Sequence, residues 1–416
     1  MVKRKKIIAS YHHSFAGGSK NTSRLLHFIS KDKYDVDAYF YENPQFFDYT
    51  KSKVKIHVLN EEQIHSDVIE SSVVKSYSFT NRIIEDLDKQ TDKILFGINL
   101  FPYCNTLLDV KSQTQHSGKN TKLILHPVGS DIWQIGPQIK SRVKWLLDNP
   151  LVDSVITYSE SFITEIKDYY GIKKEIQVLP PVLEPLKFFP LNEIEITTRK
   201  KLLGFNDNNF IIHHHSSMRR IKCPESIIEI AVKSSQIISN KCILIMSGTV
   251  PYAEIKSLNL QLERLTGPSP FIYKTQKGNL TIYWTGVVPN VEYLLQIADV
   301  ELNASLHDSF NIALMEAMAC AVPVVTSDVV GIGKHIIKAD AGYCFPTKKL
   351  QFDELNKVVN SEKSRNNFFD IDYAVSAVVS IANKQVASQN MGVRGANYVV
   401  AEFNPDKIVN EFYKLI

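Results

Sequence analysis

The chain has 416 residues, of which 44% are hydrophobic and 22% charged, with 17 Gly and 17 Pro. This is the composition of a globular protein, and it excludes a disordered, collagen-like or disulfide-stapled chain. The 48 Lys and Arg against 44 Asp and Glu give a net charge of +4, and the segment Lys3–Lys6 is basic throughout. Because the remainder is formally neutral, the charge gives no indication of a nucleic-acid partner.

Length and apolar runs bound the architecture further. At about 150 residues per domain, the length predicts two to three domains. No apolar run approaches the ~18–20 residues that cross a membrane, and the stretch Ala374–Ala382 is too short. Tyr11 and His12 follow a short apolar run too closely for a signal peptide. Five scattered cysteines without a C-x-x-C pair favour a reduced chain in the cytoplasm.

The first half of the chain alternates short apolar runs with amphipathic ones. A strand at Lys5–Tyr11 is followed by a glycine-containing loop at Phe15–Lys20, a helix at Asn21–Ser30 and a strand at Val36–Tyr41. Further strands are predicted at Lys55–Leu59, Ile94–Ile98, Lys122–His126, Ser154–Tyr158 and Glu175–Leu179. Strands that alternate with helices are typical of a parallel, doubly wound sheet.

A second alternating series follows a proline-rich segment that contains Pro180, Pro181, Pro185 and Pro190. Proline removes backbone donors and blocks helix, so this segment is interpreted as a linker. Strands are then predicted at Phe210–His214, Cys242–Ser247, Leu280–Trp284, Val300–Asn303, Val322–Thr326 and Gly342–Phe345. Helices are predicted at Ser226–Ser235, Val291–Ala298 and Ile312–Ala319.

The two series predict two similar α/β halves, with ligands bound in a cleft. We assign residues 1–184 to an N-terminal Rossmann-like domain, 185–195 to a proline-rich linker and 196–390 to a C-terminal Rossmann-like domain. The remaining residues, 391–416, are expected to form a helix that packs back on the N-terminal domain.

The most informative stretch is NASLHDSFNIALMEAMACAVPVV, from Asn303 to Val325. Asp308 lies eight residues before Glu316, and a helix is predicted from Ile312. The free amides and positive dipole end of such a helix suit a diphosphate. Glu316 lies one or two turns inside the helix, where its carboxylate could accept hydrogen bonds from sugar or ribose hydroxyls. The alternative is an amphipathic helix with a solvated glutamate.

A second stretch, IHHHSSMRRIKCPE, runs from Ile212 to Glu225. A strand ends in a serine-rich turn, and Arg219 and Lys222 follow directly before a predicted helix. Arginine makes bidentate contacts to phosphate and lysine supplies a point charge, so the pair suits the stabilisation of a departing diphosphate. The alternative is a basic surface turn.

These stretches together resemble the second domain of GT-B glycosyltransferases of family 4. The order is S-x-R-x-x-K, then YWTGVVPN at Tyr283–Asn290, then D-x7-E-A-M-A followed by P-V-V. Members are retaining, nucleotide-sugar-dependent enzymes with two Rossmann-like domains facing a cleft. Within the family the motifs are most similar to the N-acetylglucosaminyl malate synthase type. The resemblance spans nearly the whole chain and is strongest over 205–345.

The resemblance implies roles for these residues. Arg219 and Lys222 match the family's cations on the donor diphosphate. Asp308 matches the carboxylate beside the donor sugar, and Glu316 the one that holds the ribose. Amides of the intervening loop are implied to contact sugar and phosphate, and this loop corresponds to Phe310, Asn311 and Ile312.

The N-terminal half carries weaker matches. Ala16, Gly17 and Gly18 are similar to the family's glycine loop, which binds the donor side of the cleft. His126 resembles a strand-end histidine that contacts the donor sugar. Two further residues are expected near the acceptor: Asp131, in the segment after His126, and Ser159, in the turn that resembles the family's V-S turn.

The chain departs from the family pattern at several positions. The usual E-G-F-G is D-S-F-N, which shortens the first carboxylate and removes both glycines around Phe310. Ala321 stands where a glycine usually precedes V-P-V-V, and Lys334 stands where an acid is common. These departures bear on the donor sugar and on catalysis more than on the fold.

Other signals are weaker. His213 and His215 share one face of a strand, but the sequence shows no carboxylate or cysteine cluster that completes a metal site, so no metal and no cofactor are expected. The basic, amphipathic segment Gln138–Leu147, with Lys3–Lys6, could touch anionic lipid at the inner face of the membrane; an ordinary surface helix is the alternative. Several aromatic residues near strand ends could line an acceptor platform: Phe46, Phe47, Tyr77, Phe79, Phe101 and Tyr103.

The sequence therefore predicts a metal-independent retaining glycosyltransferase. Its donor is expected to be a UDP-sugar, such as UDP-GlcNAc or UDP-glucose, in preference to a GDP-sugar. The acceptor, a hydroxyl of a sugar, lipid, small molecule or protein, is not fixed by the motifs. Two alternatives stay open: a non-catalytic GT-B subunit that binds a catalytic partner, and a sugar-nucleotide epimerase.

Overall fold

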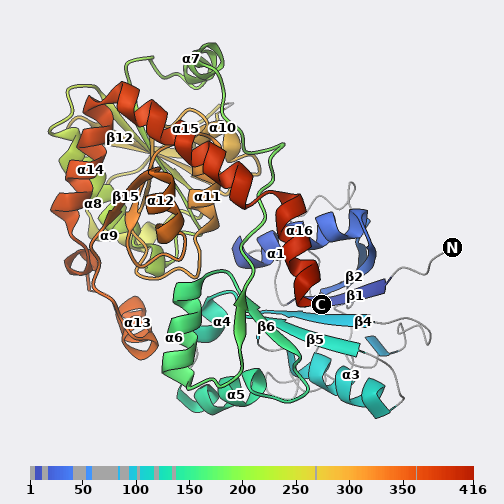
Figure 1. The fold of residues 1–416 in the computed structure, drawn as a ribbon. Helices are drawn as coiled ribbons and strands as arrows, with labels where there is room; N and C mark the ends of the chain where they lie inside the picture. Colours follow the sequence, from blue (N-terminus) through green and yellow to red (C-terminus); the bar gives the residue numbers. More distant parts are fainter. Residues whose placement is uncertain are drawn as a thin grey trace. The chain divides into compact units, whose positions relative to one another are not determined.

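The computed structural model describes residues 5–11, 17–40, 53–58, 83–84, 93–100, 104–116, 121–133, 137–267, 269–361 and 363–416. The chain divides into two compact units (Figure 1). The first comprises Met1–Val182 together with Pro405–Ile416, and the second comprises Leu183–Asn404. The predicted linker at 185–195 thus falls within the second unit, and the boundary predicted after residue 390 falls inside a helix of that unit.

The first unit is built on a seven-stranded sheet in the order β3-β2-β1-β4-β5-β6-β7. All of its strand pairs are parallel. The strands are β1 (Lys5–Tyr11), β2 (Tyr34–Phe40), β3 (Lys55–Val58), β4 (Lys93–Ile98), β5 (Thr121–His126), β6 (Ser154–Thr157) and β7 (Ile176–Val178). The helices are α1 (Gly17–Lys31), α3 (Cys104–His116), α4 (Ser130–Trp133), α5 (Pro137–Leu147), α6 (Glu160–Tyr170) and α16 (Pro405–Leu415).

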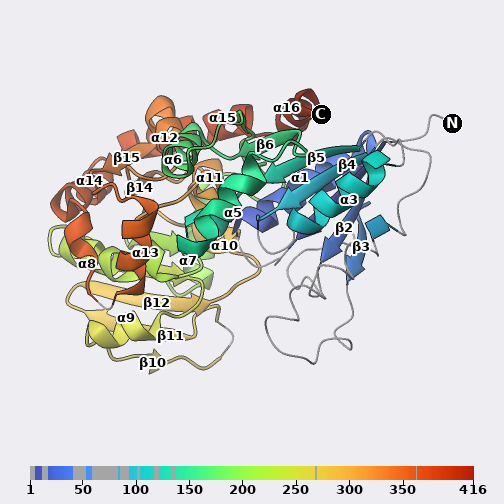
Figure 2. The same ribbon diagram turned by 90° about the horizontal axis from the view of Figure 1, so that it is seen from below.

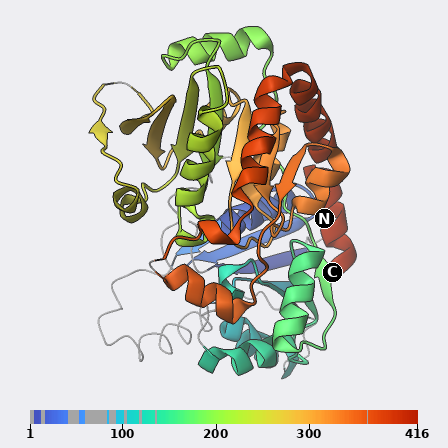
Figure 3. The same ribbon diagram turned by 90° about the vertical axis from the view of Figure 1, so that its left-hand side faces the viewer.

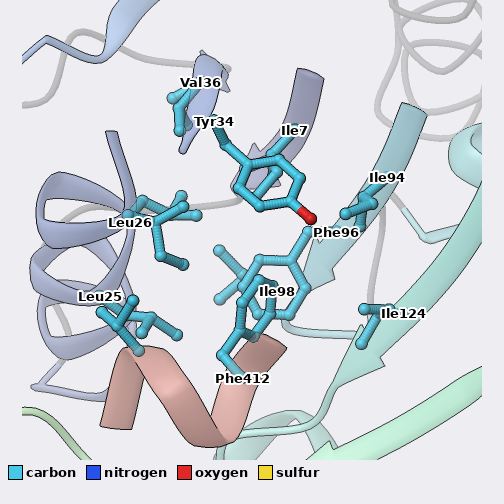
Figure 4. Close-up of a cluster of buried hydrophobic side chains, with 14 of the residues drawn as sticks. Ile7, Leu25, Leu26, Tyr34, Val36, Ile94, Phe96, Ile98, Ile124 and Phe412 are labelled. Carbon is cyan, nitrogen blue, oxygen red and sulfur yellow. The ribbon is translucent and has the colours of Figure 1, made fainter. Parts of the chain in front are cut away.

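Buried side chains of the sheet, of α1 and of the last helix form one hydrophobic cluster (Figure 4). Leu25 and Leu26 come from α1, and Phe412 comes from α16. Phe412 is fully buried, and its ring lies 5.7 Å from that of Phe96 in β4. The hydroxyl of Tyr413 donates to Asp32 at 3.0 Å. The end of the chain therefore completes the core of the first unit.

The second unit is built on an eight-stranded sheet in the order β10-β11-β12-β9-β8-β13-β14-β15. Its strands are β8 (Phe210–His215), β9 (Cys242–Ser247), β10 (Glu263–Arg264), β11 (Tyr273–Lys277), β12 (Leu280–Gly286), β13 (Val300–Asn303), β14 (Val324–Ser327) and β15 (Gly342–Phe345). Six strands are parallel, whereas β10 and β11 are antiparallel additions at one edge (Figure 2).

Helices cover both faces of this second sheet (Figure 3). On one face α8 (Pro224–Ser235) packs against α14 (Ile371–Asn383), and on the other α11 (Ile312–Ala319) packs against α15 (Gln385–Glu402). The remaining helices are α7 (Glu193–Leu202), α9 (Tyr252–Ser257), α10 (Glu292–Leu295), α12 (Gly333–Ala339), α13 (Phe352–Asn360) and the 3-10 turns η3 (Arg220–Lys222) and η4 (Asn366–Phe368).

Several predicted boundaries are wrong. The glycine loop predicted over Phe15–Lys20 gives way to helix α1 at Gly17. The helix predicted at Val291–Ala298 is confined to the single turn of α10. The antiparallel strand β11 is polar and half exposed, so it lacks the apolar run on which strand prediction relied.

In the part of the chain that the structure describes, no helix is long and apolar enough to cross a membrane.

Candidate functional site

The strand order of the second unit indicates where a ligand binds. All six strands of its parallel part run in the same direction, but the chain adds β9 and then β12 on one side of β8, and β13, β14 and β15 on its other side. The strand order therefore reverses between β8 and β13. In open parallel sheets, ligands bind beyond the carboxyl ends of the strands at this switch point. The loop after β8 carries Arg219 and Lys222, and the loop after β13 carries Asp308. The sheet thus brings the two motifs together, although 86 residues separate Lys222 from Asp308.

The loop after β8 holds its cations in a strained backbone. Met218 and Cys223 have φ angles of 51° and 41°, in the left-handed region that side chains other than glycine rarely adopt. Arg219 is exposed and its Nε donates to the Ser217 hydroxyl at 3.1 Å. Among the described residues, no carboxylate pairs with its guanidinium, which leaves this cation available to an anion.

Gly248 keeps this loop close to the end of β9. Its φ is 141°, and a Cβ at this position would lie 1.9 Å from the backbone oxygen of Ser216. The amide of Ser216 donates to Ser247 at 3.1 Å, and the amide of Gly248 donates to Gly286 at 2.9 Å. The ends of β8, β9 and β12 are therefore joined beside Arg219, and only glycine fits at position 248.

Lys222 forms an ion pair with Asp308 across the switch point. The second carboxylate oxygen of Asp308 accepts from the amides of Asn311, at 3.1 Å, and Phe310, at 3.4 Å. Burial opposes ionisation of Asp308, but Lys222 and these amides outweigh it and hold the pKa of the carboxyl below its usual value. Asp308 therefore binds the same cation and amides that the motifs assign to the donor diphosphate and sugar.

The altered D-S-F-N loop keeps the conformation that a glycine would favour. Asn311 has a φ of 75° and caps α11 by accepting from the Leu314 amide at 3.4 Å. Asparagine is the commonest non-glycine residue in this region, because its short polar side chain bonds to nearby backbone. Ser309 is not among the residues with positive φ, so its position does not need glycine. Ile312 begins α11, and Phe310 is buried beside it.

Glu316 faces a buried cluster of ionisable groups. His213 Nδ1 lies 2.6 Å from Glu301 Oε2, and the His215 amide donates to Glu301 Oε1 at 3.0 Å. His215 Nε2 lies 3.1 Å from Glu316 Oε2. Burial disfavours a charged His215, but Glu301 and Glu316 outweigh it and raise its pKa to about 9. Burial also opposes ionisation of Glu301, yet His213 and His215 lower its pKa to about 2.

Sequence reasoning found the shared face of His213 and His215 but missed Glu301. His214 points the other way, as the alternation of a strand predicts, and contacts the Leu302 oxygen at 2.8 Å. Burial lowers the pKa of His214 to about 4. The available signal for Glu301 was a charged residue inside the predicted strand VELN, which the structure pairs with β8.

The expectation that no carboxylate accompanies the histidines is therefore wrong. Within the described ranges, His213, His215 and Glu301 are the one group of three whose metal-ligand atoms lie within 4.8 Å of one another. The remaining ring nitrogens are also used, since His213 Nε2 contacts the Ser247 hydroxyl at 3.0 Å and His215 contacts Glu316. These hydrogen bonds, with the ion pair between His215 Nδ1 and Glu301 Oε1 at 3.3 Å, thus account for the cluster.

In the first unit, His126 ends β5 and is 1% exposed. Within the described part of the chain, neither ring nitrogen has a hydrogen-bond partner, and the ring centroid lies 4.5 Å from that of Tyr158 and 5.9 Å from that of Phe96. Burial lowers the pKa of His126 to about 3, so the imidazole is neutral at physiological pH. A neutral ring with unused donor and acceptor suits a hydroxyl better than a phosphate.

The two residues predicted to lie near the acceptor, Asp131 and Ser159, accept hydrogen bonds from backbone amides. Asp131 accepts from the amides of Gly129, Leu100 and Val128 at 2.8, 2.9 and 3.1 Å. Burial raises the pKa of Asp131 in spite of these bonds. Ser159 caps α6 by accepting from the Phe162 amide at 3.3 Å. Both contacts explain these residues structurally, and their roles toward an acceptor stay predictions.

The remaining predicted residues belong to the N-terminal part of the sequence, and the structure describes only some of them. Gly17 and Gly18 form the first turn of α1, where backbone amides lack helical partners. Ala16 lies outside the described residues, as do Lys3 and Arg4 and the six aromatic residues proposed for the acceptor. In α5, Val143, Leu146 and Leu147 are buried, and Lys144 pairs with Asp148 at 3.1 Å. Contact of this helix with a membrane stays a prediction.

Comparison with known proteins agrees with the motifs. Residues 195–372 match the family described as Glycosyl transferases group 1. The chain carries a group 1 glycosyltransferase domain. This domain contains both cations, both carboxylates and the start of α11, so it includes the whole candidate site of the second unit. The match supports glycosyltransferase activity.

A curated relative and solved structures extend the likeness beyond this glycosyltransferase domain. N-acetyl-alpha-D-glucosaminyl L-malate synthase from Bacillus anthracis is 24% identical over 302 residues, covering 72% of this chain and 68% of the relative. Sucrose-phosphate synthase from Thermosynechococcus elongatus is similar with a TM-score of 0.70 at 15% identity, covering 99% and 98% of the two chains. Anabaena HepE in complex with UDP-glucose is similar with a TM-score of 0.68 at 13% identity, covering 98% of each chain. The fold is thus the GT-B fold.

Proposed function

We propose that the chain is a retaining glycosyltransferase that moves a sugar from a UDP-sugar to a hydroxyl acceptor without a metal or cofactor. The observation that carries this proposal is the arrangement at the switch point of the second unit. There Arg219 is exposed and pairs with no carboxylate of the described residues, and Lys222 forms an ion pair with Asp308 of the facing loop. Helix α11 begins beside them with a turn that Asn311 caps. Such a set of donors suits a diphosphate.

The leaving group is stabilised by fixed charges in this proposal. When the bond between the sugar C1 and the diphosphate oxygen breaks, its electron pair goes to that oxygen, and negative charge grows on the diphosphate. Once the donor is bound, Arg219, Lys222 and the amides at the start of α11 already face the diphosphate and neutralise this charge as it grows, which is why they substitute for a metal. The diphosphate must displace Asp308 from Lys222, because the two anions compete for one ammonium.

Retention follows if the acceptor attacks the face from which the diphosphate leaves. The new bond forms between the acceptor oxygen and C1, and the acceptor proton passes to an oxygen of the departing phosphate. Asp308, once displaced, and the amides of Phe310 and Asn311 then lie beside the sugar hydroxyls. The role of His126 at the donor sugar remains the one that the family resemblance implies.

The UDP-sugar is favoured over a GDP-sugar by the names of the relatives. HepE was solved with UDP-glucose, and the Staphylococcus aureus protein TarM was solved with UDP and alpha-GlcNAc-glycerol. The curated relative is named for a product of N-acetylglucosamine and L-malate. UDP-GlcNAc and UDP-glucose are therefore the first donors to test, and L-malate is the first acceptor.

A donor and acceptor panel followed by product NMR tests the proposal. The protein is incubated in EDTA with UDP-GlcNAc, UDP-glucose or GDP-mannose, each with and without L-malate and a set of sugar acceptors. We expect release of UDP from one UDP-sugar and an α-linked product from the α-linked donor. A β-linked product would overturn retention, and turnover that requires added metal would overturn metal independence. Conversion of the donor without any acceptor would favour the epimerase.

A further inference from the structure

The end of β8 carries a feature that the proposed diphosphate site does not explain. Glu301 is completely buried in the middle of β13, where a charged side chain is costly unless it is paired. Its two oxygens contact the ring of His213, at 2.6 Å, and the amide and ring of His215, at 3.0 and 3.3 Å. Glu301 is too deeply buried to touch a substrate, so it acts through its neighbours.

His215 connects this buried carboxylate to Glu316. Its Nδ1 lies 3.3 Å from Glu301 Oε1, and its Nε2 lies 3.1 Å from Glu316 Oε2. The contact of Nδ1 with Glu301 has the distance of an ion pair without hydrogen-bond geometry, whereas Nε2 is hydrogen-bonded to Glu316. Two carboxylates beside one imidazole favour its positively charged form, in which each nitrogen carries a proton. One positive charge is then shared by two carboxylates that come from β13 and from α11. The ring therefore links the sheet to the helix that borders the donor site.

We propose that His215, braced by Glu301, is a positioning residue that fixes the Glu316 carboxylate for the ribose of the nucleotide donor. The inference rests on the proposed function and on the ribose contact that the family resemblance implies for Glu316. Glu316 has three rotatable side-chain bonds, and a bond to a rigid ring removes much of the entropy that ribose binding would otherwise cost. An ionised carboxylate accepts several hydrogen bonds, so contact with His215 leaves it able to bind ribose.

The side chains of asparagine and glutamine separate the two contacts of the ring. The amide nitrogen of asparagine lies near the place of a histidine Nδ1, which faces Glu301, whereas that of glutamine reaches toward the place of Nε2, which faces Glu316. His215→Asn therefore keeps a donor for Glu301 and loses the one for Glu316. His215→Gln does the reverse. Comparison of the two variants therefore separates the positioning of Glu316 from the structural role of a polar side chain at the end of β8.

Calorimetric binding of UDP and of 2′,3′-dideoxy-UDP in EDTA tests the inference. We expect wild type to bind UDP at least about tenfold more tightly than the dideoxy analogue, as for a hydrogen bond to a charged group. His215→Asn should lose most of this ratio, with its affinity for the analogue nearly unchanged, while His215→Gln should keep it. Glu316→Gln sets the ratio expected when the ribose contact is weakened directly, and His214→Asn is a control on the opposite face of the strand.

The outcomes separate this inference from the proposed function. If wild type binds no UDP, the proposed function fails. If wild type binds UDP but His215→Asn keeps the same ratio of affinities for UDP and the analogue, only the inference fails. The same holds if wild type binds UDP and the analogue equally well. Should His215→Asn not fold, nitrogen NMR of the wild-type ring decides. Protons on both nitrogens at pH 7.5, with an Nε2 signal that shifts with UDP but not with the analogue, support the inference, and any other result overturns it.

Discussion

At the scale of single residues, the pKa of His215 makes stability depend on pH. The pKa is raised to about 9 in the folded chain against 6.5 for a free histidine, and Glu301 and Glu316 face the ring, with His213 and His214 beside it on β8. Because the folded pKa is the higher one, the stabilisation is complete below pH 6.5 and is lost as pH rises through 9. The shift corresponds to about 3 kcal/mol at most.

Urea unfolding at several pH values measures this contribution. We expect the free energy of unfolding of wild type to exceed that of His215→Asn most at pH 6, and the difference to shrink steadily up to pH 9.5. Subtracting the free energy of unfolding of the variant from that of wild type cancels the contributions of the other carboxylates and histidines, apart from those that contact the ring. A difference that is flat or grows with pH would show that His215 is neutral in the folded chain.

Ala321 is a residue whose backbone would prefer glycine. It follows α11 with a φ of 59°, where a Cβ costs roughly 1–2 kcal/mol. Since glycine also gains entropy when unfolded, we expect Ala321→Gly to stabilise the protein by about 0.5–1 kcal/mol net. Ala319→Gly, in the last turn of α11, is the matched control and should destabilise by about 1 kcal/mol. Thermal unfolding of both variants checks the opposite signs.

At the scale of elements, Gly248 tests whether the loop after β8 must lie close to β9. Gly248→Ala should force the Ser216 backbone away, because the new Cβ would lie 1.9 Å from its oxygen. We expect a loss of more than about 2 kcal/mol in stability and weaker UDP binding, since Arg219 and Lys222 follow on the same loop. Calorimetry and urea unfolding give the two values.

Gly278→Ala provides the control for backbone strain alone. Gly278 has a φ of 61° but no atom within 4 Å of the place of a Cβ. Its replacement should cost about 1 kcal/mol and leave UDP binding intact. Equal effects of the two substitutions on UDP binding would mean that contact with Ser216 does not position the cations.

Elements with a strong periodic pattern could be predicted from the sequence, and the partners across the sheet could not. Alternation along β8 placed His213 and His215 on one face, and the motifs around Asp308 and Arg219 both predicted contact with a diphosphate. Glu301 escaped prediction because its partners lie 86 to 88 residues away, and nothing local marks a buried carboxylate. The left-handed conformations of Asn311 and Ala321 escaped too, because those positions were interpreted only as lost glycines.

At the scale of the whole molecule, the chain crosses from the second unit back to the first at residue 405. A return of the C-terminal end was expected, but the sequence did not reveal that α15 stays in the second unit while only α16 leaves it. The reason is physical: α16 has a strongly amphipathic pattern and α15 a weak one, and the pattern of a helix does not say which sheet it covers. The buried ring of Phe412 marks the helix that packs on the first unit.

Phe412→Ala tests how much the first unit depends on α16. Removing a fully buried phenylalanine from a core typically costs 3–5 kcal/mol. We expect hydrogen exchange to accelerate in α16, α1 and the strands β1, β2 and β4, and to stay unchanged in β8 and β13. Val400→Ala, on an exposed face of α15, is the control and should alter neither set. Faster exchange in the second unit alone would contradict the assignment of α16.

The central claim is that the switch point of the second unit binds the diphosphate of a nucleotide without metal. Calorimetric titration of UDP in EDTA into wild type, Arg219→Ala and Arg264→Ala tests it most directly. Both arginines are exposed, so neither substitution should unfold the chain, and Arg264 lies on the edge strand β10, whose loops do not belong to the switch point. We predict binding to wild type and Arg264→Ala, and affinity reduced about 10- to 100-fold in Arg219→Ala. Equal binding to all three proteins, or binding only when metal is added, would contradict the account.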